Sequence, residues 1–173
     1  MSLSLYDVTV SGFLQTVDAI EAVLHKGLAH CRSADLDPAS LVEARLHPDM
    51  LPLRFQVVSI VKHSVGAIEC VKAGLFGRPP EVPPLDYAQL QATLADAQAT
   101  LRAYTRDEID ALAQRELRFQ PGELHLQFTA VDFLLSFSIP NFHFHATTAY
   151  DILRSKGVPI GKRDYLGRMR VKT

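Results

Sequence analysis

Hydrophobic residues recur every three or four positions in four long stretches of the chain, the spacing typical of amphipathic helices. We expect helices near residues 4–31, 50–75, 86–104 and 129–156. The third stretch has the most regular stripe, and Asp86 with Gln89 at its start has the signature of a capping box. Pro140 lies inside the fourth stretch and predicts a kink or a restart there, because proline has no N–H to donate to the preceding turn.

The hydrophobic period changes to strict alternation between Leu117 and Phe128, on either side of a turn that contains Pro121 and Gly122. This pattern predicts a small β-hairpin before the last helix. Four prolines between residues 79 and 84 predict an extended crossover between the second and third helices. Together these elements predict an all-α fold, a four-helix bundle with one hairpin, in a single domain over residues 1–173.

Composition narrows the class of protein. The 173 residues include 18 basic and 19 acidic side chains, so a nucleic-acid partner bound through bulk charge is not expected. The sequence has no apolar run approaching the ~20 residues of a membrane helix, so no membrane partner is expected either. Two cysteines, Cys31 and Cys70, cannot form a disulfide framework, and we therefore expect a cytoplasmic protein.

Histidines are the candidate metal-binding residues of this sequence. His143 and His145 would diverge by about 200° on a helix and could not bind one ion, whereas Asn141 and His145 are four apart and share a face. His63 lies about 60° around its helix from Ile60, at the edge of the apolar arc, where a residue would line a groove between helices. Taken alone, His63 and His145 also fit the pattern of structural histidines in a core.

Segments from residue 128 onward resemble the DinB/YfiT-like superfamily of bacterial four-helix-bundle metalloenzymes, in an uncharacterised branch. The segments that carry the resemblance are 128–132, 139–142, 144–150 and the tail 157–167. In that superfamily one histidine on helix two and two histidines four apart on helix four hold a divalent ion. The resemblance assigns these positions to His63, Asn141 and His145, the last because twelve residues separate it from Gly157. Asparagine thus stands where the superfamily has its middle histidine.

The resemblance implies a divalent metal, zinc or nickel, between helices two and four. His63 and His145 would be ligands, and Asn141 would either offer a weak carbonyl oxygen or orient His145. Related members act on small molecules through a thiol cofactor, but no residue here selects a ligand of that kind. The alternative is a non-catalytic dimeric bundle with a degenerate metal site. In either case we expect a homodimer formed through helices, as is common in the superfamily, and the broad apolar arc of helix two agrees with this expectation.

Overall fold

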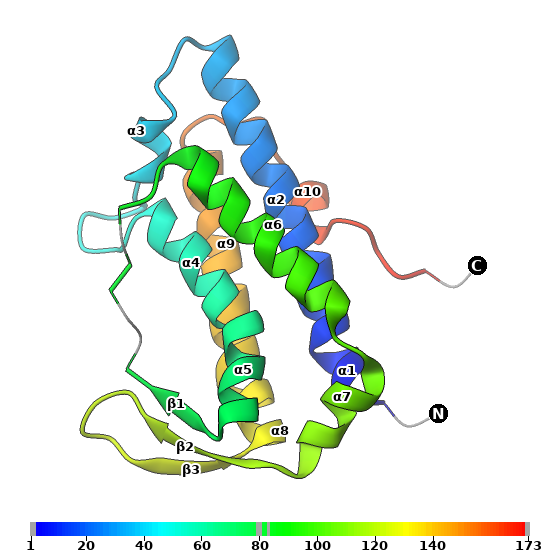
Figure 1. The fold of residues 1–173 in the computed structure, drawn as a ribbon. Coiled ribbons are helices and arrows are strands. Elements are labelled where there is room, and N and C mark those ends of the chain that lie inside the picture. The colour runs from blue at the N-terminus through cyan, green and yellow to red at the C-terminus, as the bar shows by residue number, and fades with distance from the viewer. Residues whose placement is uncertain (1–2, 79–80, 83, 172–173) are drawn as a thin grey trace.

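A computed structural model describes residues 3–78, 81–82 and 84–171. The protein is mostly helical, with a small three-stranded sheet at one end (Figure 1). The predicted extended crossover falls in part on residues 79–80 and 83, outside the described residues.

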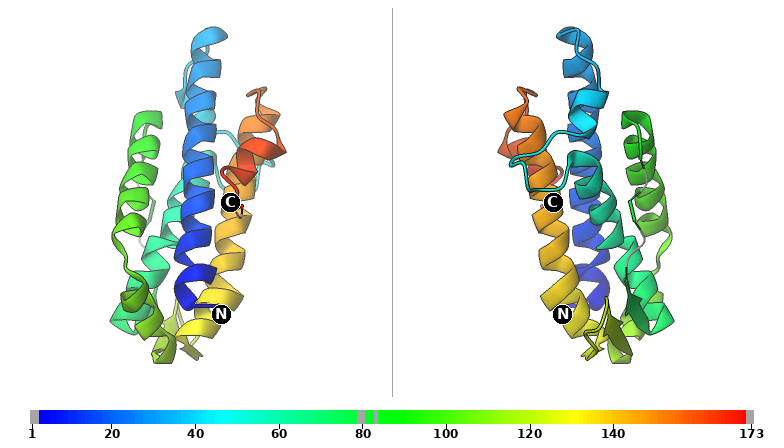
Figure 2. Two further views of the ribbon diagram at one scale, coloured as in Figure 1. Left: turned by 90° about the vertical axis from the view of Figure 1, so that its right-hand side faces the viewer. Right: turned by 90° about the vertical axis from the view of Figure 1, so that its left-hand side faces the viewer.

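Helices account for all four predicted stretches. They are α1 Leu5–Val8, α2 Val10–Ser33, α3 Ala39–Val42, α4 Leu53–Lys62, α5 Val65–Ala73, α6 Tyr87–Ala103, α7 Arg106–Asp110, a 3₁₀ turn Ala111–Gln114, α8 Ala130–Asp132, a π-helical segment Phe133–Ser138, α9 Ile139–Ser155 and α10 Lys162–Leu166. The strands are β1 Leu75–Gly77, β2 Glu116–Gln120 and β3 Leu126–Thr129. Figures 1 and 2 show α2, α4, α6 and α9 running side by side, with α9 packed on α4 and α6 packed on α2.

The third helix is confirmed with its cap. Asp86 accepts a hydrogen bond from the backbone N–H of Gln89 at 2.7 Å, and the side chain of Gln89 accepts one from the backbone of Asp86 at 2.8 Å. This exchange satisfies two of the N–H groups that a helix N-terminus leaves free. The buried stripe of α6 then packs on α2, where Tyr87 donates a hydrogen bond to the Leu24 carbonyl at 2.8 Å.

The second helix is not continuous, so the prediction of one helix over residues 50–75 is wrong in this respect. α4 ends at Lys62, and α5 begins at Val65. His63 and Ser64 lie in the break, and the hydroxyl of Ser64 donates to the Ile60 carbonyl at 2.8 Å. A hydroxyl that binds the carbonyl four residues earlier competes with the helical backbone hydrogen bond and is a known cause of helix distortion. The break leaves the imidazole of His63 between two helical segments.

The hairpin prediction is confirmed, but it omitted a strand. β2 and β3 pair antiparallel, and β1 adds to β2 in parallel, which gives the order β1-β2-β3. Gly74 has the left-handed φ of 72° that ends α5 close to the predicted helix end at residue 75, and the chain then turns into β1. Phe76 of β1 stacks on Phe119 of β2 with ring centroids 5.0 Å apart. The expected all-α fold therefore contains a three-stranded sheet.

The sequence predicts a kink or a restart of the last helix at Pro140, and the change from π-helix to α-helix falls beside this residue, at Ile139. Pro140 lies in the first turn of α9, where its missing N–H costs least. Thr129 caps the start of the whole segment by accepting from the backbone of Asp132 at 3.1 Å. Gly157 follows the end of α9 with a φ of 88°, the expected left-handed stop.

Apolar side chains of the helices are buried against one another in the core. Phe13 of α2 meets Phe142 of α9 with ring centroids 4.8 Å apart, and both rings are fully buried. Within the described ranges, no helix combines the length and the apolar character that crossing a bilayer requires.

Candidate functional site

Two histidines from distant parts of the sequence meet between α4 and α9. His63 lies in the break between α4 and α5, and His145 lies in the middle of α9. Their rings are stacked, with centroids 5.7 Å apart and an angle of 14° between the ring planes. Only 5% of His63 and 9% of His145 is exposed to solvent. The packing of α9 on α4 thus brings these two predicted site residues into direct contact.

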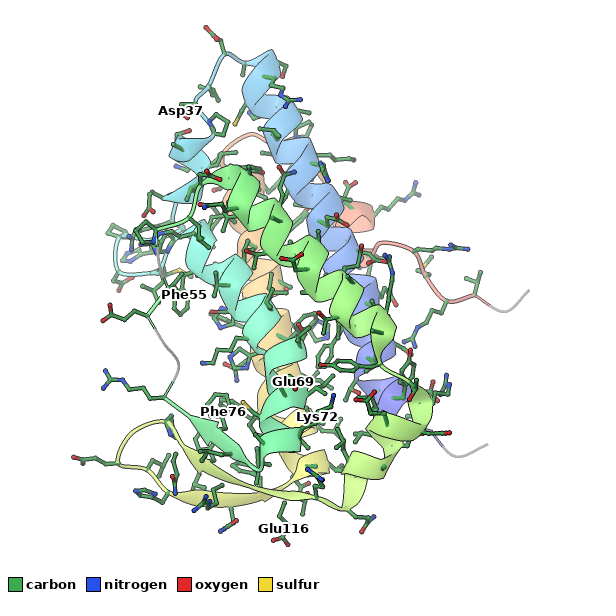
Figure 3. The ribbon with its side chains drawn as sticks, in the orientation of Figure 1. Asp37, Phe55, Glu69, Lys72, Phe76 and Glu116 are labelled. Carbon is green, nitrogen blue, oxygen red and sulfur yellow. The ribbon has the colours of Figure 1, made fainter. Side chains whose placement is uncertain are left out.

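Aromatic rings continue this stack on both sides. The ring of Phe55 meets His145 edge-on at 5.8 Å, and the ring of Phe76 stacks on His63 at 6.5 Å. Figure 3 labels the two phenylalanines, Phe55 on α4 and Phe76 on β1. Phe137 of the π-helical segment meets His63 edge-on at 5.5 Å. The histidine pair therefore lies within an aromatic wall that limits the access of water.

The two rings differ in their polar contacts. Nδ1 of His145 lies 2.8 Å from Oε1 of Gln56, a residue of α4 that is 2% exposed. Gln56 also donates from Nε2 to the carbonyl of Leu51 at 2.8 Å. Nδ1 of His63 is buried and has no hydrogen-bond partner among the described residues. A buried nitrogen in that state has lost water without compensation, so it is available to a ligand.

Asn141 lies on α9, one helical turn before His145. Its amide nitrogen donates to the Phe137 carbonyl at 2.7 Å, a group of the π-helical segment. This contact leaves the amide oxygen as the only side-chain atom of Asn141 that can bind a cation. In the structure His63 thus contacts His145, whereas the Asn141 amide nitrogen is hydrogen-bonded to the π-helical segment that precedes α9.

Both histidines are uncharged at neutral pH. Burial, with a contribution from the positive charge of Lys62, lowers the pKa of His63 to about 3 and that of His145 to about 4. Neutral imidazole is the form that binds metal ions. Lys62 itself is half-buried, and its ammonium lies 5.0 Å from the centre of the Phe76 ring. Its charge would repel a cation bound at the histidine pair, and the bonds between the imidazoles and the ion must outweigh this repulsion.

Sequence reasoning missed Gln56 and Lys62. Gln56 carries a detectable signal, because it lies four positions before Ile60 and seven before His63, on the apolar face of the helix. A polar residue on a buried stripe requires a partner, and that partner is His145. Nothing in the sequence singles out Lys62 from other lysines on a helix surface.

The donor set is small. Across residues 3–78, 81–82 and 84–171, no group of three or more His, Cys, Asp or Glu side chains is arranged to hold a metal ion. A metal at the histidine pair would therefore take its remaining ligands from an amide oxygen, from water or from a bound small molecule.

Comparisons with known proteins agree with the fold. The family model described as a domain of unknown function, DUF1993, matches residues 5–166. Among solved structures, a DinB family member protein from Shewanella denitrificans is similar with a TM-score of 0.78 and 27% sequence identity. The match covers 98% of this chain and 95% of that one. No curated protein matches the sequence.

Proposed function

The chain belongs to the DUF1993 family, and its likeness to a DinB family member confirms the resemblance found in the last helix; on this premise we propose that it binds a divalent metal ion between α4 and α9. His63 and His145 are the ligands, and Asn141 is either a weak oxygen ligand or the residue that orients His145. Zinc or nickel suits an imidazole set of this kind. In this proposal α2, α4 with α5, α6 and α9 are the four columns of a single-domain four-helix bundle.

The stacked, buried histidine pair is the observation that supports the proposal most directly. The ring centroids of two neutral imidazoles from separate elements lie 5.7 Å apart, and one ring has a buried nitrogen with no hydrogen-bond partner in the described part of the chain. Leaving such an atom unsatisfied costs about 1–3 kcal/mol. A metal ion would satisfy His63 and would use His145 in the neutral form that burial already enforces.

The residues around the pair indicate what the site could do. A bound divalent ion would lower the pKa of a coordinated water or thiol. The chain itself keeps both imidazoles uncharged, and Phe55, Phe76 and Phe137 shield them from bulk water.

Elemental analysis of protein purified without an affinity tag tests the proposal. We expect about one zinc or nickel ion per wild-type chain after loading and dialysis, and loss of that ion in both His63→Ala and His145→Ala. His143→Ala is the matched control, because His143 is exposed on the same helix two residues from His145. Retention of wild-type metal content by His145→Ala, or no ion in the loaded wild type, would contradict the proposal.

A second candidate function is a non-catalytic dimeric bundle whose metal site has degenerated. The positive charge of Lys62 beside the histidines and the engagement of the Asn141 amide with Phe137 favour it. This candidate predicts no metal and a homodimer formed through helices. Sedimentation at micromolar concentration tests the dimer, and a mass near the 19.2 kDa of one chain would exclude it.

A further inference from the structure

We infer that Gln56 is a positioning residue that holds His145 in one tautomer, with the proton on Nδ1 and the lone pair on Nε2. The tautomer follows from hydrogen bonds within this chain alone. The consequence, that His145 offers Nε2 to a metal ion, rests on the proposed function.

The tautomer follows from two consecutive hydrogen bonds that link the Leu51 carbonyl, the Gln56 amide and the His145 imidazole. The carbonyl of Leu51 can only accept a hydrogen bond, so the Gln56 atom 2.8 Å from it is the amide nitrogen. The amide oxygen is therefore the atom that lies 2.8 Å from Nδ1 of His145. An amide oxygen can only accept, so Nδ1 must carry the proton. A neutral imidazole has one N–H, which leaves Nε2 with its lone pair free.

Burial makes this arrangement strict. Gln56 is 2% exposed and His145 is 9% exposed, so water cannot readily replace either partner. Turning the amide around would place its oxygen against the Leu51 carbonyl oxygen, two acceptors with no hydrogen between them, whichever tautomer His145 adopts. In a buried site the loss of a hydrogen bond costs more than it does at the surface, because no solvent compensates. Gln56 is thus locked by Leu51, and His145 is locked by Gln56.

The two histidines differ as a result. Nδ1 of His63 has no partner among the described residues, so no contact of this kind fixes the tautomer of His63. His145 is thus the preorganised ligand of the pair. Histidines that bind metals usually donate their second N–H to a carbonyl or carboxylate, and loss of that partner weakens metal binding typically by about 10–100-fold. Gln56 supplies such a partner without adding a charge.

Long-range ¹H–¹⁵N NMR of the zinc-free protein at pH 7 tests the tautomer. We expect His145 of the wild type in the form with Nδ1 protonated. Gln56→Met keeps the length of the side chain but removes the acceptor, and it should shift His145 toward the form with Nε2 protonated. Gln56→Glu restores an acceptor and should retain the wild-type tautomer. Thr148→Val, a change at another buried polar residue of α9, is the control and should leave the spectrum of His145 unchanged.

Zinc titration of the same proteins tests the consequence. We expect Gln56→Met to raise the Kd for zinc by about 10–100-fold, and Thr148→Val to leave it unchanged. Protonation of Nε2 in the wild type, or an unaltered tautomer in Gln56→Met, would overturn the inference. The wild-type spectrum decides this even if Gln56→Met does not fold. The expected tautomer in a wild type that binds no zinc would confirm the role of Gln56 and would remove only the metal proposal.

Discussion

Asn141→His is expected to tighten zinc binding by on the order of tenfold or more, because it adds a third imidazole to the pair. Position 141 lies one helical turn before His145, so the new ring would lie on the same face of α9. Three imidazoles with one water form a complete tetrahedral set for zinc, whereas the amide oxygen of asparagine is a weak ligand. Competition against a chromophoric chelator would measure the change in Kd.

Two variants make this result specific to the site. Ala95→His adds an imidazole at an exposed position of α6, and it should not change the Kd for the pair. Asn141→His combined with His63→Ala should lose the gain, because one ligand is again missing. If Asn141→His binds zinc and nickel no better than the wild type, the three residues are not a ligand set, and the histidine pair is a buried polar cluster.

Local signals in the sequence identify the elements that depend on neighbouring residues alone. The capping box at Asp86 and Gln89 and the left-handed stop at Gly157 appear in the structure as predicted. In each case the interacting groups lie within four residues of each other, so tertiary packing is not needed to predict them. The change from π-helix to α-helix beside Pro140 belongs to the same class.

The features that were missed depend on distant parts of the chain or on weak local signals. β1 is only three residues long, and it becomes a strand by pairing with β2 more than 40 residues later. The break at His63 and Ser64 involves neither proline nor glycine, and the hydroxyl of Ser64 marks it by donating to the carbonyls of Ile60 and Val61. Propensity alone does not predict either feature, because tertiary contacts override it.

Part of the candidate site could likewise be predicted from the sequence, and part of it depends on tertiary packing. The resemblance of the last helix pointed to His63, Asn141 and His145, and the structure places the two histidines in contact. The contact between Gln56 and His145 joins residues 89 positions apart and requires the packing of α4 on α9. A sequence shows that Gln56 lies on a buried face, but only the fold identifies its partner.

Acid is expected to destabilise the metal-free protein well above the pH at which carboxylates are protonated. Burial lowers the pKa of His63 from 6.5 to about 3 and that of His145 from 6.5 to about 4. Between about pH 6.5 and pH 4 the unfolded chain therefore binds protons that the folded chain does not, and the free energy of unfolding falls as the pH falls. Each histidine contributes at most about 1.4 kcal/mol per pH unit in this window. Urea unfolding in EDTA at pH 7, 6 and 5 would measure the slope.

Variants of the histidine pair assign that slope to its source. His63→Gln with His145→Gln removes both groups, so the stability of the double variant should depend much less on pH between 7 and 5. The control is His125→Gln, which removes an exposed imidazole between β2 and β3 that solvent reaches in both states, and it should keep the wild-type slope. A wild type with equal stability at pH 7 and pH 5 would show that the two rings are protonated without unfolding. The pair would then be open to water, and burial could not hold the two imidazoles neutral for a metal ion.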